Sequence, residues 1–314
     1  MSDYDVVIVG AGVAGLTAAR QVAEGGARAL VLDRLGVGGQ VSSVENLTNA
    51  PGFDRAIAGY DVGVELLEAA EAAGAEILLA EVTGIVDDGD GFVLTGLDEP
   101  LHARAVIVAG GSERRALGIA GEQEFEGRGV SRCASCDGPF FRDRRVVVVG
   151  GGDSAFDEAR VLADFADEVL VVHTGAEPTA RAEISEPTLA RQNVRVQAFA
   201  TVSAISGDGA VSAVSIQDAR TGDATEVEAS GVFVYIGLRP NTEWLGGAVE
   251  LDDEARVVVD GDLAASREGV FAAGDVRSGT AAMLAESAAD GERAARSALR
   301  HLDRMHPVET GAAS

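Results

Sequence analysis

The chain has 314 residues, 46% of them hydrophobic and 4% aromatic, with 40 glycines, which suits two α/β domains that each bury a core. Its formal net charge is -26, from 51 acidic residues against 25 basic ones, and every basic residue other than histidine is arginine. So negative a protein disfavours binding to nucleic acid or to an anionic membrane. The longest apolar runs are strand-sized, well short of the roughly 20 residues of a membrane span. We therefore expect no nucleic-acid or membrane partner, and a cytoplasmic location because no signal-peptide pattern opens the chain.

The first predicted unit is a strand, a turn, a helix and a second strand. Residues 5–9 contain four consecutive apolar side chains, typical of a buried strand. The turn Gly10-Ala11-Gly12-Val13-Ala14-Gly15 follows, then a helix to about residue 24. A strand over residues 29–32 ends at Asp33. This order is that of a dinucleotide-binding βαβ unit.

The residue types in this turn suit a pyrophosphate. Gly10 permits a tight bend, Gly12 lets the backbone approach the phosphates, and Gly15 lets the helix pack on the strand. The phosphates then meet the helix N-terminus. Asp33 is placed to accept hydrogen bonds from a ribose diol. We predict a bound dinucleotide here; the alternative is a glycine turn that serves only the fold.

A second unit of the same kind begins about 140 residues later. It has a strand over residues 145–149, the turn Gly150-Gly151-Gly152-Asp153-Ser154-Ala155, a helix to about residue 163 and a strand over residues 168–172. A phosphate on the ribose 2′ position needs cationic donors after that last strand, and an unphosphorylated ribose commonly meets an acid. The sequence there is His173-Thr174-Gly175-Ala176-Glu177, which has neither an arginine pair nor an acid at the strand end.

The segments between and after the two units follow a matching plan. Residues 81–95 and 104–109 are expected to form a hairpin and a return strand, and residues 231–237 resemble the latter. Pro240-Asn241 is typical of a crossing between domains. Residues 270–275 are a further strand and turn, and an alanine-rich helix is predicted from about residue 280 to residue 304.

The two cysteines of the chain stand in one motif, Cys133-Ala134-Ser135-Cys136, with Asp137 next to it. Only two cysteines at this spacing exclude a disulfide-stapled secreted fold and leave a local pair. Such thiols close a small disulfide ring, and stabilising one thiolate favours exchange with a partner or attack on a flavin. Asp137 is suited to move the proton involved. Zinc is a poorer interpretation, because a site needs about four ligands and no second such motif exists, so we expect no metal.

In order along the chain, seven pieces together resemble the low-molecular-weight thioredoxin reductases, from about residue 3 to about residue 303. The pieces are Gly10-Ala11-Gly12-Val13-Ala14-Gly15, Val37-Gly38-Gly39-Gln40, Asn49-Ala50-Pro51-Gly52, Cys133-Ala134-Ser135-Cys136-Asp137-Gly138, Gly150-Gly151-Gly152-Asp153-Ser154-Ala155, Gly237-Leu238-Arg239-Pro240-Asn241-Thr242 and Ala273-Gly274-Asp275-Val276.

The resemblance implies an α/β protein with two Rossmann-like dinucleotide-binding domains, a bound FAD and a homodimer. Residues 1–112 and 245–314 would form the FAD domain, split by an inserted NAD(P)-type domain of residues 113–244 that carries the cysteines. In that family the inserted domain rotates on two hinges, so that the cysteines alternately face the flavin and an external protein disulfide.

The resemblance also implies roles for single residues. Cys136 would be the thiol nearest the flavin, Cys133 would attack the substrate disulfide, and Asp137 would be the acid. The residues expected to hold FAD or lie near it are Gly10, Gly12, Val13, Ala14, Gly15, Asp33, Gly39, Gln40, Asn49, Val82, Ala109, Gly110, Gly274, Asp275, Ala282 and Met283. Those of a second nucleotide site are Gly150, Gly152, Asp153, Ser154, Ala155, His173 and Arg181.

Two departures from the family bear on the electron donor. Members that use NADPH carry an arginine pair where this chain has Thr174-Gly175, and an arginine and a glutamine where it has Ala282-Met283. An arginine contact to phosphate contributes on the order of 1.5–3 kcal/mol, so losing two such contacts weakens NADPH roughly a hundredfold or more. Use of NADPH or NADH is therefore doubtful, and a ferredoxin is another candidate donor.

Three functions stay open at this point. The first is reduction of thioredoxin or a similar small protein through the cysteine pair. The second is oxidation of a small-molecule dithiol with oxygen as the acceptor, although such oxidases have histidine where this chain has Asp137. The third is a flavin-bound redox sensor without turnover, which the intact Cys133, Cys136 and Asp137 disfavour.

Overall fold

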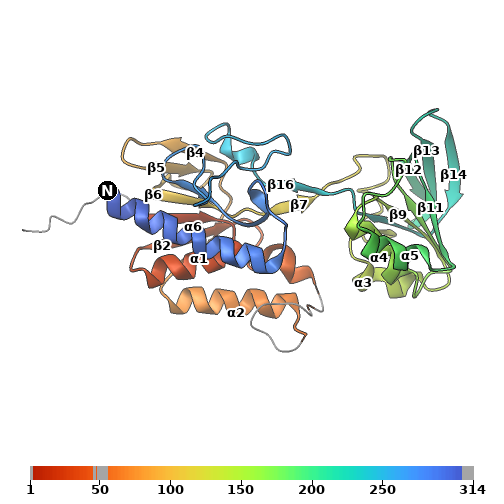
Figure 1. Ribbon diagram of the computed structural model, residues 1–314, viewed down its shortest axis with the longest axis horizontal. Coiled ribbons are helices and arrows are strands. Elements are labelled where there is room, and N and C mark those ends of the chain that lie inside the picture. The colour runs from red at the N-terminus through yellow and green to blue at the C-terminus, as the bar shows by residue number, and fades with distance from the viewer. Residues whose placement is uncertain (1–2, 45–46, 48–55, 306–314) are drawn as a thin grey trace, which may run out of the picture. The chain divides into compact units, whose positions relative to one another are not determined.

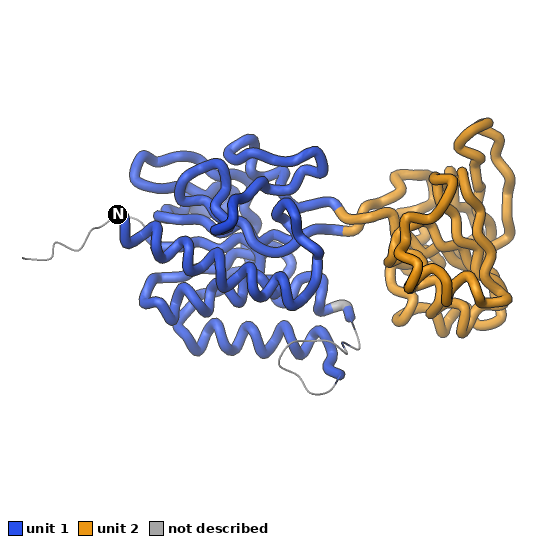
Figure 2. Tube along the Cα trace, viewed as in Figure 1, with its two compact units in different colours: residues 1–113, 239–314 blue, residues 114–238 orange. Residues whose placement is uncertain are grey.

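The structure is a computed structural model that describes residues 3–44, 47 and 56–305. The chain divides into two compact units, coloured blue and orange in Figure 2. Unit 1 comprises Met1–Glu113 and Arg239–Ser314, and unit 2 comprises Arg114–Leu238. The sequence predicts that the chain crosses between the units at residues 112/113 and 244/245. In the structure the crossings fall at residues 113/114 and 238/239.

Unit 1 is built on a seven-stranded sheet of strand order β3-β2-β1-β6-β5-β4, with β17 pairing the end of β6 (Figure 1). Strands β1, β2, β3, β6 and β17 run parallel, and β4 and β5 form an antiparallel hairpin at one side. The strands are β1 (Tyr4–Val9), β2 (Ala29–Asp33), β3 (Glu76–Leu79), β4 (Gly84–Asp87), β5 (Phe92–Thr95), β6 (Leu101–Val108) and β17 (Val270–Ala272).

Three helices pack together on one side of this sheet, as Figure 1 shows: α1 (Val13–Glu24), α2 (Gly59–Ala72) and α6 (Leu284–Met305). The α1–α6 contact is close, since a Cβ at Gly291 would lie 2.3 Å from the carbonyl oxygen of Ala14. Val6, Val7 and Ile8 of β1 are all fully buried because both faces of the parallel strands are covered. Three short 3₁₀ helices complete the unit: η1 (Gly39–Ser43), η3 (Glu243–Leu245) and η4 (Gly274–Val276).

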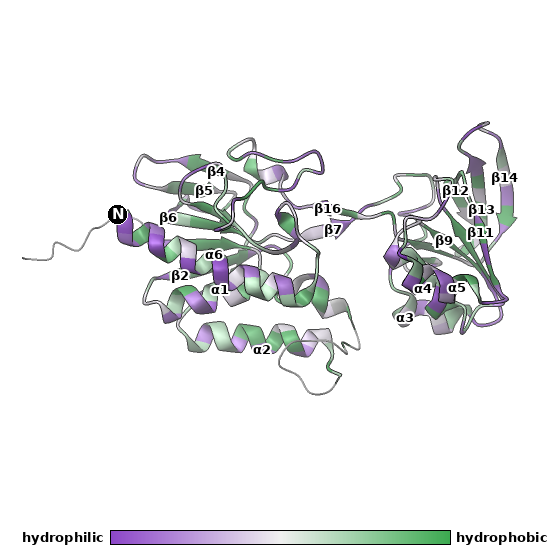
Figure 3. Ribbon diagram, in the orientation of Figure 1, coloured by the Kyte–Doolittle hydropathy of each residue, from purple (hydrophilic) through white to green (hydrophobic). Residues whose placement is uncertain are grey.

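Unit 2 has a parallel five-stranded sheet of order β11-β10-β9-β15-β8 and a three-stranded antiparallel sheet of order β12-β13-β14. Figure 3 shows apolar strands within both units and helices that are polar on one side. The strands are β8 (Val130–Ser131), β9 (Arg145–Val149), β10 (Glu168–Val172), β11 (Val194–Gln197), β12 (Ala200–Gly207), β13 (Val211–Asp218), β14 (Ala224–Glu228) and β15 (Gly231–Val234). The helices are α3 (Ala134–Asp137), η2 (Gly138–Phe141), α4 (Asp153–Leu162) and α5 (Ala182–Leu189).

The remaining strands are β7 (Ser112–Arg114) and β16 (Leu238–Pro240), which pair as a two-stranded sheet at the points where the chain leaves one unit and returns. Both predicted βαβ units are confirmed: β1-α1-β2 in unit 1 and β9-α4-β10 in unit 2. Within the described residues, no helix is long and apolar enough to cross a membrane.

Candidate functional site

The first glycine-rich turn joins β1 to α1 and leaves no room for larger side chains at two positions. Gly10 has a φ of +116°, and a Cβ there would lie 2.3 Å from the carbonyl oxygen of Ala109. A Cβ at Gly15 would lie 1.8 Å from the carbonyl oxygen of Gly10. At Gly12, by contrast, the atom nearest to an added Cβ is the Cα of Gly39 at 4.0 Å. The backbone is therefore tightly folded yet open beside Gly12, as a pyrophosphate requires.

Asp33, at the end of β2, is bonded to the backbone around this turn. Its Oδ2 accepts a hydrogen bond from the amide of Ala11 at 2.7 Å. Its Oδ1 accepts from the amides of Leu35 at 2.8 Å and Gly36 at 2.9 Å. The carboxylate thus ties the strand end to the glycine turn. Its contact with a ribose remains a prediction.

A second group of polar side chains surrounds Asp275, which lies in η4 after β17. Gln40 Nε2 donates to the Ser112 carbonyl oxygen at 2.8 Å and lies 3.5 Å from Asp275 Oδ2. The hydroxyls of Ser112 and Ser287 donate to Asp275 at 3.3 Å and 3.5 Å. Burial raises the pKa of Asp275 in spite of these hydrogen bonds. The structure therefore joins two predicted residues, Gln40 and Asp275, to two serines that were not predicted.

These two features lie next to each other. A Cβ at Gly274 would lie 3.0 Å from the Cβ of Ala14 in the first turn of α1. The amide of Gly38 donates to the Ala11 carbonyl oxygen at 2.9 Å, which brings η1 and Gln40 beside the glycine turn. An open backbone at a helix start suits the pyrophosphate of FAD, and the polar side chains around Asp275 lie beside it.

The other residues predicted near FAD differ in burial and in their contacts, and one of them lies outside the described residues. Val82 and Ala109 are buried in unit 1, with exposed fractions of 7% and 5%. The carbonyl oxygen of Gly110 accepts from Asn241 Nδ2 at 2.7 Å. Asn49 lies outside the described residues. Their contacts with FAD remain predictions.

The loop between η4 and α6 is fixed by a buried arginine. Arg277 Nε donates to Asp290 Oδ2 at 2.6 Å, and its Nη2 donates to Glu286 Oε1 at 2.9 Å. Arg277 and Asp290 are 9% and 1% exposed. Further along the loop, Ala282 has a φ of +53° and Met283 is 56% exposed. This loop therefore offers an alanine and an exposed methionine where NADPH-using relatives of the resembled family carry polar side chains.

In unit 2 the two cysteines form a disulfide, with an S–S distance of 2.08 Å. Cys136 belongs to the single-turn helix α3, and Cys133 immediately precedes that helix. The amide of Cys136 lies 3.2 Å from Cys133 Sγ. Two-electron reduction would break this S–S bond and give two thiols, which is the chemistry predicted for the motif.

Ser131, which was not predicted, holds the acid of the motif in place. Its hydroxyl donates to Asp137 Oδ2 at 2.6 Å and accepts from the amide of Cys133 at 3.1 Å. Ser131 is 7% exposed. Its position at the end of β8 therefore links the Asp137 carboxylate to the backbone of the first cysteine.

A second carboxylate approaches the cysteine turn from α4. Glu158 Oε2 accepts from the amide of Ala134 at 2.9 Å, and Tyr235 Oη accepts from the same amide at 3.1 Å. Tyr235 also hydrogen-bonds the Glu158 carboxylate. The Arg114 guanidinium lies 6.0 Å from the centre of the Tyr235 ring. Sequence reasoning did not find these residues.

Two phenylalanines follow the motif and differ in exposure. Phe141 is buried and its ring packs edge-on against Phe233, with the centroids 5.2 Å apart. Phe140 is 75% exposed. A large apolar side chain therefore faces solvent close in sequence to the disulfide.

The second glycine-rich turn joins β9 to α4 with similar backbone geometry. Gly150 has a φ of +140°, and a Cβ there would lie 2.1 Å from the carbonyl oxygen of Tyr235. The atom nearest to a Cβ at Gly152 is Thr179 Oγ1 at 3.8 Å. Ala155 occupies the position of Gly15 and is fully buried. The turn has the shape of a dinucleotide site.

The side chains around this second turn are arranged differently from those around the first. His173 follows β10, is 5% exposed, and its Nε2 is buried without a hydrogen-bond partner. Burial lowers its pKa, so the imidazole is neutral at pH 7. Arg181 Nε donates to Asp153 Oδ2 at 2.6 Å, and its Nη1 donates to Glu183 Oε1 at 3.3 Å. The cation predicted for this site is thus paired with two carboxylates of the chain itself.

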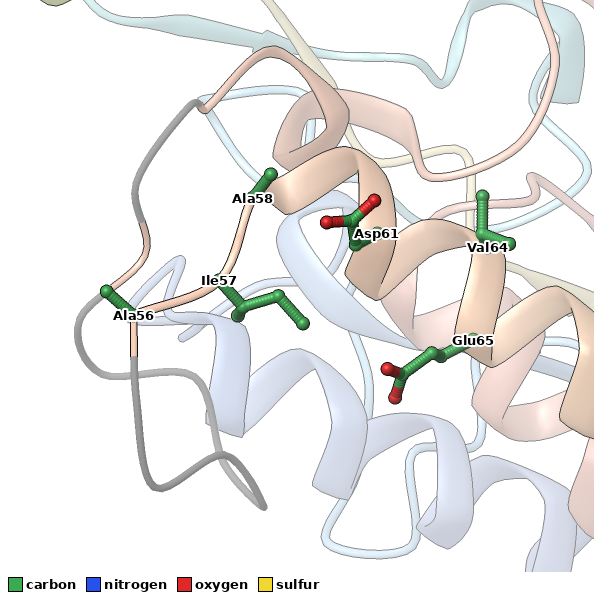
Figure 4. A pocket seen from close by; sticks show the side chains of 6 residues that line it. All are labelled: Ala56, Ile57, Ala58, Asp61, Val64 and Glu65. Carbon is green, nitrogen blue, oxygen red and sulfur yellow. The ribbon is translucent and has the colours of Figure 1, made fainter.

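A hollow of about 480 Å³ lies at the start of α2 in unit 1 (Figure 4). It is lined by Ala56, Ile57, Ala58, Asp61, Val64 and Glu65. None of these is a predicted site residue. Among the residues that the structure describes, no group of three His, Cys, Asp or Glu side chains is arranged to hold a metal ion.

Residues 4–292 match the pyridine nucleotide-disulphide oxidoreductase family, and the chain belongs to this family. It is 41% identical over 304 residues to the thioredoxin reductase of Treponema pallidum, which spans 97% of this chain and 99% of that relative. Its fold is similar to the crystal structure of Lactococcus lactis thioredoxin reductase, with a TM-score of 0.85, 34% identity, and coverage of 96% of this chain and 100% of the other. It is also similar to a ferredoxin-flavin thioredoxin reductase from Clostridium acetobutylicum, with a TM-score of 0.54, 25% identity, and coverage of 97% and 99%.

The fold and the site therefore define a flavoprotein oxidoreductase with a disulfide centre. Within its family, the chain resembles the low-molecular-weight thioredoxin reductases, as the sequence motifs predicted.

Proposed function

We propose that this protein reduces the disulfide of thioredoxin or of a similar small protein through Cys133 and Cys136. The observation that carries the proposal is the disulfide itself, beside an acid held by Ser131 at 2.6 Å. FAD would supply two-electron redox chemistry. The glycine turn of unit 1 and the polar group of Gln40, Ser112, Asp275 and Ser287 would hold it.

The proposed exchange needs only groups of the reduced cysteine turn. The Cys133 thiolate attacks one sulfur of the substrate disulfide, which forms a mixed disulfide and releases a substrate thiolate. Asp137, which has taken up the proton of the Cys133 thiol, gives it to that thiolate. Cys136 then attacks Cys133 Sγ, which releases the second substrate thiol and restores the Cys133–Cys136 disulfide. Two electrons leave the cysteine pair and two reach the substrate.

We propose further that NADPH is a poor electron donor for this protein. The neutral, buried His173 cannot attract a 2′-phosphate, and Arg181 is already paired with Asp153 and Glu183. Exposed Thr174 and Gly175 offer no cation either. NADH or a ferredoxin is the better candidate, and a ferredoxin-flavin reductase is among the similar structures.

Anaerobic mixing of the oxidised holoenzyme with NADPH, and separately with NADH, tests the donor. We expect NADPH to bleach the flavin absorbance slowly, because the 2′-phosphate lacks its contacts. A dithiol added afterwards should reduce the flavin fully, which shows that the cofactor is competent. Rapid bleaching by NADPH at micromolar concentration would contradict the proposed donor preference.

The substrate is tested with the holoenzyme reduced beforehand by dithionite and freed of excess reductant. We expect it to reduce an oxidised thioredoxin, and the C133S variant to lose this transfer while it still binds FAD. A dithiol oxidase is the competing function. Such an oxidase needs no nicotinamide site, so the altered nicotinamide site of this chain is compatible with it. Rapid oxygen uptake with a small dithiol, without transfer to thioredoxin, would favour that function instead.

We also propose that the protein forms a homodimer. The edge strand β3 of unit 1 presents Leu78 and Leu79, which are 51% and 73% exposed, and such apolar side chains on a sheet edge are typical of a contact surface. Light scattering on the holoenzyme should give the mass of two chains. A mass of one chain would contradict this.

A further inference from the structure

A half-buried carboxylate and a half-buried phenol lie against the cysteine turn, and no step of the proposed exchange uses them. The amide of Ala134 donates to Glu158 Oε2 at 2.9 Å and to Tyr235 Oη at 3.1 Å. The Tyr235 hydroxyl in turn donates to the Glu158 carboxylate. Three groups from three elements, namely α3, α4 and the end of β15, thus form one closed set of hydrogen bonds.

The electrostatic surroundings of Glu158 are mixed. Burial raises its pKa, while the Ala134 amide, the Tyr235 hydroxyl and the Arg114 guanidinium oppose that shift, and the neighbouring Asp157 adds to it. Burial also raises the pKa of Tyr235, so its hydroxyl stays protonated and remains a donor. A carboxylate so placed carries its charge where water screens it only partly.

The Glu158 charge lies close to the first cysteine sulfur. Ala134 N belongs to the peptide bond that follows Cys133, so covalent geometry keeps Cys133 Sγ within roughly 7 Å of Glu158 Oε2. Reduction of the disulfide adds two electrons, and any thiolate that forms is a new negative charge. A carboxylate nearby makes that charge less favourable and raises the pKa of the thiol.

We propose that Glu158 is a positioning residue that fixes the start of the cysteine turn through the Ala134 amide and, by its charge, makes the Cys133–Cys136 disulfide harder to reduce. In the balanced step, the S–S bond breaks, two electrons enter from the reductant and up to two protons enter from solvent. Glu158 lowers the share of the thiolate form among the products. Tyr235 keeps the carboxylate ionised and in place. The inference rests on the disulfide being redox-active, as the proposed function requires.

The test is the disulfide equilibrium of the holoenzyme in dithiothreitol buffers of graded ratio. Free thiols are captured with an alkylating reagent that adds mass and are counted by gel shift. We expect E158Q, which removes the charge and keeps the shape, to favour the reduced form about tenfold, a midpoint about 30 mV more positive. The thiol pKa, followed by thiolate absorbance, should fall in the same variant.

D157N is the matched control, because Asp157 is exposed on the same helix and the charge change is the same. It should move the equilibrium by less than about twofold, as expected for a screened surface charge. Y235F should shift the equilibrium in the same direction as E158Q but by less, since a carboxylate without its donor is protonated more readily.

Two results would overturn the inference: an E158Q midpoint equal to that of the wild type, or a D157N shift as large as that of E158Q. If circular dichroism shows that E158Q does not fold, a Y235F midpoint equal to that of the wild type overturns the inference by itself. The assay uses neither thioredoxin nor a nicotinamide. Its failure is therefore distinct from a failure of the proposed function.

Discussion

The two glycine-rich turns of this protein have similar backbone geometry. They differ in the side chain at the end of the strand that follows each βα pair. In unit 1, Asp33 accepts hydrogen bonds from Ala11, Leu35 and Gly36. In unit 2, the corresponding strand β10 is followed by His173, whose buried Nε2 has no partner. The glycine pattern therefore reports how closely backbone and helix approach, whereas the side chain after the second strand decides what the turn is able to bind.

The neighbouring charges extend this difference. Around the first turn, η1 and η4 bring Gln40 and Asp275 together. Around the second turn, Asp153 and Arg181 pair with each other across a distance of 2.6 Å. Polar side chains from two other segments meet beside the first turn, whereas the cation beside the second turn is paired within the chain.

The largest expected effect comes from exchanging glycine and alanine at the matching helix-packing positions of the two turns, Gly15 and Ala155. G15A places a Cβ 1.8 Å from the Gly10 carbonyl oxygen, so we expect loss of bound FAD and destabilisation of unit 1 by about 3 kcal/mol. The matched change A155G in unit 2 should reduce stability by only about 1 kcal/mol. Flavin content after gel filtration and thermal unfolding measure both variants. Full FAD retention by G15A would show that the two turns tolerate the same packing.

The second prediction concerns the nicotinamide site of unit 2. The double variant T174R/G175R supplies the cations that the second turn lacks, and we expect NADPH to bind about tenfold more tightly. Titration of the oxidised holoenzyme, followed by tryptophan or flavin fluorescence, measures this. NADH binding should not change, because it carries no 2′-phosphate. An equal gain for both nucleotides would mean that the added charge acts without recognising the phosphate.

The smallest expected effect concerns His173. Its folded-state pKa is lowered by burial, so its contribution to stability is present above the unfolded pKa of about 6.5 and is lost as pH falls towards the folded pKa. The thermal midpoint of unit 2 should therefore fall between neutral pH and about pH 5, and fall less in H173Q. H102Q, at a partly exposed histidine of unit 1 that contacts Asp88, is the control. An identical pH dependence in H173Q and wild type would exclude this role.

Local patterns were sufficient to predict the βαβ units and the cysteine pair. The apolar runs that became β1 and β9, and the turns after them, are continuous in sequence and specify their own geometry. Ser131, Glu158 and Tyr235 were missed because they lie on β8, α4 and the end of β15, and only tertiary packing brings them to the cysteine turn. A serine two residues before the motif was the one local signal available.

The last helix shows how a tertiary contact overrides local propensity. Alanine-rich composition predicted a helix from about residue 280, but α6 begins at Leu284. Arg277 is bonded to Glu286 and Asp290, and Ala282 has a φ of +53°, which a right-handed helix does not allow. The buried ion pair therefore keeps the preceding residues in a loop.

That same ion pair has a consequence for the behaviour of so acidic a protein in concentrated salt. At an ionic strength of about 1 M the screening length is about 3 Å, and exposed pairs such as Arg296–Glu292, with side chains 55% and 51% exposed, lose most of their attraction. The Arg277 and Asp290 side chains are only 11% and 2% exposed, so dissolved ions do not reach between them. The segment that carries Asp275 thus stays anchored to α6 in brine that weakens the surface pairs.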